Sequence, residues 1–132
     1  MSQENVETVR RALAGVLGGA WLQVLAELDP AIEIEDTVIP DASDYRGHNG
    51  FFRWLERWNE SWESWRLEDI ELVPVGDDHV VGLWRMVAKG KGSGIELSRR
   101  DALICTLRAG KIEKGTYYND QQQALEAVGL SE

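Results

Sequence analysis

The sequence predicts an α+β fold in which helices come first and a curved antiparallel sheet follows. Two observations predict it: apolar residues recur at helical spacing near the N-terminus, and later segments read as strands separated by turn signals. The chain has 132 residues, the length of one domain, so we expect residues 1–132 to form a single domain. A chain of this length can bury a substantial core.

The helices are predicted from the spacing of apolar residues and from the residues that end each run. Residues 4–17 carry one apolar stripe, which ends at Gly18-Gly19: Val6, Val9, Leu13, Val16 and Leu17. A shorter helix follows over residues 20–28 and stops at Asp29-Pro30. A closing helix is expected over residues 120–130.

The strands are predicted from alternation and from the turns between them. Residues 31–39 alternate like a strand, and residues 40–50 read as a turn-rich loop. Four more strands are expected, joined by short turns rich in glycine: residues 66–75, 77–89, 94–108 and 111–120. Sequential strands with such short connections pair antiparallel.

A stretch rich in tryptophan lies between these two halves. Residues 51–65, FFRWLERWNESWESW, hold four of the six tryptophans of the chain. On a helical wheel the apolar side chains share one arc: Phe51, Trp54, Leu55, Trp58, Trp62 and Trp65. We expect an amphipathic helix that covers the sheet, with its last turn leading toward a strand. The alternative is a protein-docking face, which would expose a large apolar patch.

Composition excludes several functions. The formal charge is −9, with 14 Lys and Arg against 23 Asp and Glu, so the chain would repel nucleic-acid phosphates and anionic membranes. The N-terminus has no signal-peptide pattern, and we expect a cytoplasmic protein. Cys105 is the single cysteine and is expected to be a buried thiol. His48 and His79 lack clustered partners, so no metal site is predicted.

Two aspartates stand where apolar residues are expected. Asp36 shares a strand face with Ile32 and Ile34, and a carboxylate there is either partnered or functional, because a buried unpaired charge is costly. The alternative is that Asp36 caps the following loop. Asp101 lies with Arg99 on the apolar face of its strand, where the two can pair. That pair is either part of a site or a structural ion pair.

Three segments together resemble SnoaL-like proteins of the nuclear transport factor 2-like superfamily. They are YRGHNGFFRWLERW, LICTLRAGKI and YYNDQQQALEAVGL, and the similarity extends along nearly the whole chain. The resemblance implies a cone, also described as a cystatin-like α+β barrel, whose bent sheet surrounds a deep apolar pocket closed by helices. It also implies a homodimer that packs through the outer face of the sheet.

The resemblance also suggests roles for the two aspartates. IEDTVIP resembles the ketosteroid isomerase segment that carries a general-base aspartate, at the position of Asp36. Arg99-Arg100-Asp101 resembles the Arg-x-Asp pair of limonene epoxide hydrolase. The chain departs from both relatives, with Ala12 near the place of the isomerase tyrosine and Tyr117 in place of the second hydrolase aspartate.

These observations predict an acid–base site inside an apolar pocket. We expect Asp36 and Asp101 to transfer protons on an apolar or polycyclic carbonyl compound, as in an isomerase, a cyclase or an epoxide hydrolase. Arg99 and a set of aromatic residues would bind this small molecule: Trp54, Trp58, Trp84 and Tyr117. No cofactor is needed for this chemistry. The alternative is a non-catalytic hydrophobic-ligand-binding or dimerising scaffold.

Overall fold

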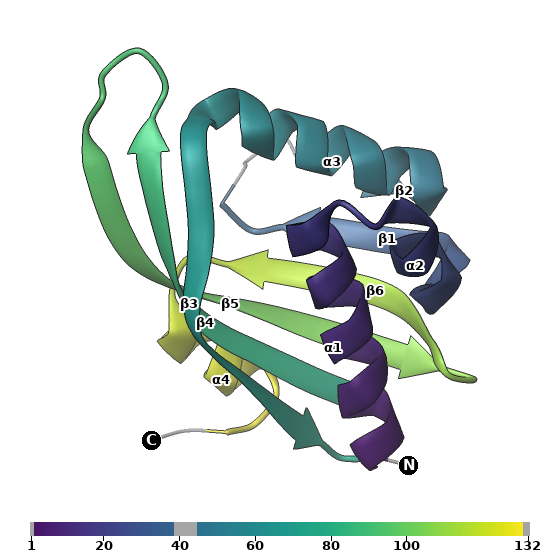
Figure 1. Cartoon of the computed structure of the whole chain (residues 1–132). Coiled ribbons are helices and arrows are strands. Elements are labelled where there is room, and N and C mark those ends of the chain that lie inside the picture. Colours follow the sequence, from purple (N-terminus) through teal and green to yellow (C-terminus); the bar gives the residue numbers. More distant parts are fainter. Residues whose placement is uncertain (1, 39–44, 131–132) are drawn as a thin grey trace.

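Two helices begin the described part of the chain, a third helix stands between the second and third strands, and a fourth helix follows the last strand (Figure 1). A computed structural model describes residues 2–38 and 45–130. The helices are α1 (Ser2–Gly18), α2 (Trp21–Glu27), α3 (Gly47–Ser61) and α4 (Gln121–Ala127). The strands are β1 (Leu28–Asp36), β2 (Tyr45–Arg46), β3 (Trp62–Val75), β4 (His79–Gly90), β5 (Glu96–Arg108) and β6 (Lys111–Tyr118).

The strands form one sheet in the order β2-β1-β6-β5-β4-β3. The predicted antiparallel pairing of the last four strands is confirmed. The sheet as a whole is mixed, because β1 lies parallel to β6 with Asp36 opposite Tyr117. Turn signals between neighbouring strands do not predict this pairing, because α3 and four strands separate β1 from β6 along the chain.

Helices cover both faces of the sheet (Figure 1). α1 packs against β3 and β4, and α3 packs against β1, β2 and β3 on the same side. α4 contacts β4, β5 and β6 from the opposite side. Along the described chain the sheet ends at β2 and β3, and it bends around the side that α1 and α3 cover without closing.

The tryptophan stretch divides between a helix and a strand, which corrects part of the prediction. α3 begins at Gly47 and ends at Ser61, so Trp62 and Trp65 belong to β3 and pair with Gly90 and Ala88 of β4. The turn-rich loop predicted over residues 40–50 is wrong for residues 45–50, which form β2 and the first turn of α3. Residues 39–44, which include the last residue of the strand predicted over 31–39, lie outside the described residues.

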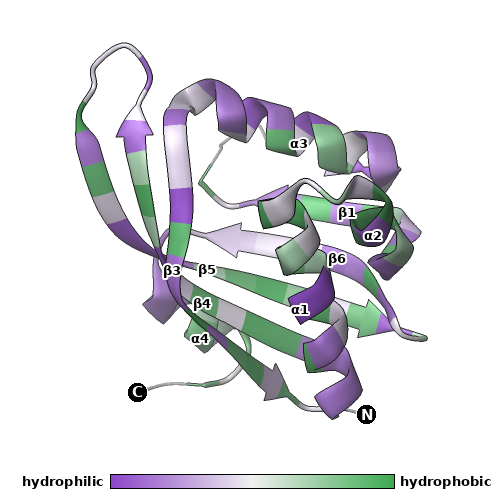
Figure 2. Ribbon diagram, viewed as in Figure 1, coloured by the Kyte–Doolittle hydropathy of each residue, from purple (hydrophilic) through white to green (hydrophobic). Residues whose placement is uncertain are grey.

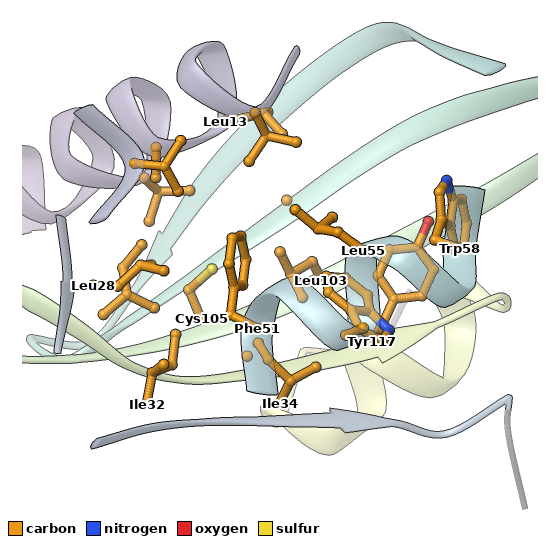
Figure 3. A pocket seen from close by; sticks show the side chains of 18 of the residues that line it. Leu13, Leu28, Ile32, Ile34, Phe51, Leu55, Trp58, Leu103, Cys105 and Tyr117 are labelled. Carbon is orange, nitrogen blue, oxygen red and sulfur yellow. The ribbon is translucent and has the colours of Figure 1, made fainter. Parts of the chain in front are cut away.

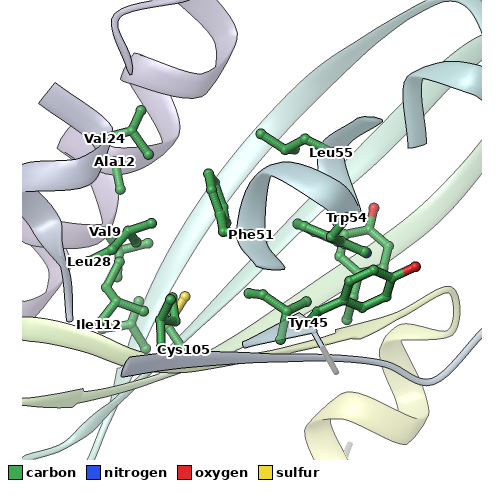
Figure 4. Packing of buried hydrophobic residues seen from close by; sticks show 14 of the residues in the cluster. Val9, Ala12, Val24, Leu28, Tyr45, Phe51, Trp54, Leu55, Cys105 and Ile112 are labelled. Atoms are coloured by element: carbon green, nitrogen blue, oxygen red, sulfur yellow. The ribbon is translucent and has the colours of Figure 1, made fainter. Parts of the chain in front are cut away.

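The core lies mainly between the sheet and the helices α1 to α3. Figure 4 shows Phe51 of α3 standing between Val24, Ala12 and Leu28 on one side and Trp54 on the other. Figure 2 shows apolar residues along the strands beneath the helices, with polar residues along the outer side of α3. A smaller cluster on the other face packs Tyr118 near Ala124 of α4. None of the described helices is long and apolar enough to span a membrane.

Candidate active site

An apolar cavity of about 100 Å³ lies inside the main core. In the close view of Figure 3, Leu28 lies at one end of the cavity, and Trp58 and Tyr117 lie at the other. The predicted pocket residues Trp54, Trp58, Trp84 and Tyr117 all line it. The other lining residues come from the helices and the sheet: Val9, Ala12, Leu13, Val16, Val24, Leu28, Ile32, Ile34, Phe51, Leu55, Trp65, Leu67, Gly82, Leu103, Cys105, Ile112 and Gly115.

A second cavity, of about 200 Å³, carries charged side chains in its wall and is called here the charged cavity. Its lining residues are Asp36, Val38, Trp54, Arg57, Trp58, Ser61, Trp62 and Arg99. Trp54 and Trp58 line both cavities, so these two indoles form the wall between them. Asp36, Arg57 and Arg99 therefore line the charged cavity, and the indoles of Trp54 and Trp58 separate it from the apolar cavity.

Asp36 is buried at the end of β1, with 3% of its surface exposed. Its Oδ2 accepts a hydrogen bond from Trp54 Nε1 at 2.8 Å, and its Oδ1 accepts one from the backbone N–H of Val38 at 3.0 Å. Each carboxylate oxygen can accept a further hydrogen bond. Asp36 thus makes a local bond to the following loop, as the capping alternative predicts, and also lines the charged cavity.

Asp101 is enclosed completely, with an exposed fraction of 0%. Arg99 donates from Nε to Oδ1 at 2.6 Å and from Nη2 to Oδ2 at 3.0 Å, which makes a two-pronged ion pair. The Tyr117 hydroxyl also donates to Oδ2. The predicted pairing of Arg99 with Asp101 is therefore confirmed.

Tyr117 joins the buried acid to the apolar cavity. Its hydroxyl oxygen accepts a hydrogen bond from Trp84 Nε1 at 3.4 Å while it donates to Asp101. Burial raises the pKa of the Tyr117 hydroxyl well above its ordinary value, and the negative charge of Asp101 raises it further. Tyr117 is thus a neutral donor in this network, whereas Tyr118 packs toward the closing helix.

Two tryptophan rings lie against the guanidinium of Arg99. The Arg99 Cζ atom lies 5.9 Å from the ring centroid of Trp58 and 6.0 Å from that of Trp62, within the range of cation–π attraction. Trp58 also contacts the rings of Trp54 and Tyr117, at centroid distances of 6.4 Å and 5.3 Å. These rings pack on one another, so the stretch covers the core and the cavities and does not form a free docking face.

The two aspartates do not look into one apolar hollow, which corrects the expectation from the sequence. Among the described residues, neither Asp36 nor Asp101 lines the apolar cavity. Alternation along a strand predicts the face on which a side chain lies. It does not predict what closes over that side chain, and here Arg99 and Tyr117 enclose Asp101. Arg57 also lines the charged cavity although it is exposed, and the sequence did not single it out as a site residue.

Cys105 lies against the apolar cavity and is expected to be unreactive. The thiol is 2% exposed, and burial raises its pKa to about 12. The reactive species is the thiolate, and almost none forms at pH 8. We expect no reaction of the folded protein with Ellman's reagent over an hour at pH 8, and complete reaction in 6 M guanidinium chloride. Fast labelling of the folded protein would contradict the burial of this side chain.

Solved structures share this fold at low sequence identity. An NTF2-like protein from Burkholderia pseudomallei K96243 matches with a TM-score of 0.76 and 18% identity, over 98% of this chain and 99% of that chain. A candidate polyketide cyclase from Xanthomonas campestris pv. campestris matches with a TM-score of 0.77 and 20% identity, over 97% and 98%. A protein with a ketosteroid isomerase-like fold from Catenulispora acidiphila DSM 44928, in complex with trimethylamine, matches with a TM-score of 0.72 and 18% identity, over 94% and 93%.

The family is shown by the sequence itself. The family model described as the SnoaL-like domain matches residues 9–114, which include α3, both aspartates and most of the sheet. The chain matches no curated protein sequence. The structural matches confirm the predicted α+β cone of the NTF2-like and ketosteroid isomerase-like proteins. The chain therefore belongs to the SnoaL-like family.

Proposed function

We propose that this protein is a cofactor-independent enzyme that transfers a proton on an apolar or polycyclic carbonyl compound. One observation carries the proposal: Asp36 and Arg99 line the same cavity, which shares a wall with an apolar cavity. A carboxylate and a guanidinium beside an apolar hollow are suited to acid–base chemistry on a carbonyl group. The apolar cavity would hold the hydrocarbon part of the substrate.

In this proposal Asp36 is the base. The C–H bond next to the carbonyl breaks, the proton moves to Asp36, and the electron pair moves onto the carbonyl oxygen. Arg99 donates hydrogen bonds to that oxygen as negative charge develops on it. In an isomerisation Asp36 then returns the proton to a different carbon of the enolate. In a ring closure the enolate carbon instead forms a bond to a second carbonyl carbon of the substrate, whose C=O electron pair moves onto its oxygen, and Asp36 gives the proton to that oxygen. Trp54 holds the carboxylate in place through its bond from Nε1.

Asp101 is a positioning residue in this proposal. Its enclosure prevents direct contact with a substrate, and its bonds fix both the Arg99 guanidinium and the Tyr117 hydroxyl. The charges of Arg57 and Arg99 balance those of Asp36 and Asp101, so a neutral carbonyl compound suits the site better than a permanent anion. The same enclosure disfavours an epoxide-hydrolase reaction, which would need Asp101 to reach a water molecule.

Two structural matches are consistent with substrates of this kind. A candidate polyketide cyclase from Pseudomonas putida KT2440 has a TM-score of 0.73 and 19% identity, over 92% of this chain and 96% of that chain. The protein TerC, co-crystallised with polyporic acid, has a TM-score of 0.74 and 20% identity, over 95% and 98%. Both names point toward cyclic carbonyl chemistry in proteins of this fold.

The test is exchange of the hydrogens next to the carbonyl of 1-tetralone, a ketone with two fused rings. We expect the protein to accelerate their replacement by deuterium in D₂O, followed by proton NMR. Asp36→Asn should lower the enzyme-dependent rate at least 100-fold, because removing a general base costs about 10²–10⁴ in rate. Exchange at the wild-type rate in Asp36→Asn would refute the role of Asp36.

Glu35→Gln is the matched control for this test. Glu35 precedes Asp36 on β1, is exposed, and lies 3.6 Å from Lys114 in a surface ion pair. The control removes one negative charge from the same strand without touching the cavity. We expect its exchange rate to stay within twofold of the wild type. Thermal denaturation of both variants separates a lost base from a lost fold.

A non-catalytic binder of hydrophobic ligands is the second candidate. The observation in its favour is that the described lining of the apolar cavity contains no charged side chain. A ligand held only there would meet no acid or base. In that case 1-tetralone would bind, and its hydrogens would exchange no faster than in buffer. A dimerising scaffold would also need no acid or base at the apolar cavity. Sedimentation would detect the homodimer that we expect from the family resemblance.

A further inference from the structure

The apolar cavity is too small for the substrates proposed above. Its volume is about 100 Å³, whereas an apolar cavity of about 150 Å³ is known to hold one benzene molecule. Ligand pockets usually measure about 300–1,000 Å³. A compound with two or more fused rings therefore does not fit the apolar cavity alone, and it needs the space of the charged cavity as well.

Two indoles, Trp54 and Trp58, separate these spaces, and they are held differently. Trp54 is buried, and its Nε1 donates to Asp36 at 2.8 Å. Trp58 is half-buried, and its Nε1 finds no acceptor among the described residues, although it is shielded from solvent. Trp58 also lies within one turn of the end of α3 at Ser61. The indole of Trp58 is held by packing against neighbouring rings and by the Arg99 guanidinium, without a hydrogen bond to any described residue.

The neighbouring tryptophans confirm that this lack of a hydrogen bond is unusual in the cluster. Trp65 donates from Nε1 to Asn59 Oδ1 at 2.8 Å, and Trp84 donates to the Tyr117 hydroxyl. A buried donor without an acceptor disfavours the conformation that contains it. If the side chain of Trp58 rotates, its N–H can donate a hydrogen bond to water or to a ligand. This gain favours movement of the indole away from the position in this structure.

We propose that Trp58 is a movable partition that sets the size of the ligand. When its indole swings aside, the two cavities join, and a flat ketone of two or more fused rings can place its rings in the apolar cavity and its carbonyl oxygen beside Arg99. When the indole is in place, the two cavities stay separate, and a single ring fits only the charged cavity of about 200 Å³, beside Arg99. This inference rests on the proposed function for the carbonyl group of the ligand, but it concerns binding and not turnover.

The partition has a measurable cost for large ligands. If only a minor fraction of molecules has Trp58 aside, the apparent affinity for a large ligand falls by that fraction, whereas a single-ring ligand is unaffected. Removing the indole should remove this cost. The affinity for the large ligand then rises, and the affinity for the small one stays nearly constant.

The test compares two ketones that differ by one fused ring, cyclohexanone and 1-tetralone. Their dissociation constants are measured by calorimetry with the wild type and with Trp58→Ala. We expect Trp58→Ala to bind 1-tetralone at least tenfold more tightly and cyclohexanone within threefold of the wild type. Trp58→Phe keeps an aromatic ring of smaller size and should tighten 1-tetralone about threefold, and it replaces Trp58→Ala if circular dichroism shows that the alanine variant is unfolded.

Trp62→Ala is the matched control. Trp62 contacts Trp58 and Arg99 as a neighbouring ring and lines the charged cavity, but it does not line the apolar cavity. Its removal enlarges one cavity without joining the two. Because Trp62 contacts Arg99 in the charged cavity, its removal should affect both ketones alike, and we expect the ratio of the two dissociation constants to stay within threefold of the wild-type ratio.

The outcomes separate the partition from the proposed function. If the wild type and all variants bind 1-tetralone with the same dissociation constant, the binding site is supported and the partition is refuted. If Trp58→Ala and Trp62→Ala tighten 1-tetralone alike, added space explains the gain and the partition is refuted. If no protein binds either ketone, the partition and the proposed substrate class both fail. A loss of exchange in Asp36→Asn with no effect at Trp58 would support the proposed function alone.

Discussion

Asp101→Asn is expected to lower the free energy of unfolding by about 3–5 kcal/mol, the usual cost of breaking a buried ion pair by changing one partner. Asp101 is 0% exposed and accepts hydrogen bonds from Arg99 and Tyr117. An asparagine leaves the guanidinium without its countercharge. It also turns one acceptor into a donor that faces other donors. Equilibrium unfolding in urea, followed by tryptophan fluorescence, measures the change.

Asp120→Asn is the control for this prediction. Asp120 is the N-cap of α4 and accepts from the backbone N–H groups of Gln122 and Gln123. Asparagine caps a helix about as well as aspartate, so this variant should stay within about 0.5 kcal/mol of the wild type. If Asp101→Asn were equally mild, Asp101 would not be a structural centre of the fold. A direct role in proton transfer would then regain support.

Gly50→Ala is expected to cost about 2–3 kcal/mol, because it overpacks the contact between α3 and β2. A Cβ atom at position 50 would lie 2.5 Å from the carbonyl carbon and 2.9 Å from the Cα atom of Tyr45. Both are backbone atoms, so no side chain can move aside, and the helix and the strand must separate. The midpoint of thermal unfolding and the urea curve should both fall.

Gly18→Ala is the matched control, since it makes the same change in another helix. Gly18 is the last residue of α1, and no described atom lies within 4 Å of a Cβ atom placed there. Alanine favours a helix over glycine by up to about 1 kcal/mol, so this variant should be neutral or more stable. Equal destabilisation by both substitutions would indicate a general sensitivity of the helices and not a close contact at Gly50.

Local patterns predicted much of the fold. On β5 the alternation of Leu97, Leu103, Cys105 and Leu107 identified the face that packs on the core, and it placed Arg99 and Asp101 on that face as a pair. Turns between successive strands gave the antiparallel order of β3 to β6. These features depend on residues that are near neighbours along the chain, which is why the sequence reveals them.

Contacts between one element and the next were not predictable in this way. The role of Gly50 comes from the backbone of Tyr45 lying against α3, and a glycine in a polar stretch looked like part of a turn. The sequence predicted that the last turn of this stretch leads toward a strand, but the helical wheel placed Trp62 and Trp65 on the same arc as Trp58, and α3 ends before them at Ser61. Pairing of these two residues with β4 decides that they form a strand.

The sequence alone determined that the chain folds as an α+β domain of the SnoaL-like family, with two acids on apolar strand faces and a cluster of indoles nearby. Only the tertiary structure decided that Asp101 is enclosed by Arg99 and Tyr117, that Asp36 lines a separate cavity, and that Trp58 stands between the two spaces. The reason is physical: periodicity specifies the direction of a side chain from its own strand or helix. Burial, pairing and cavity shape depend on which other elements close around it.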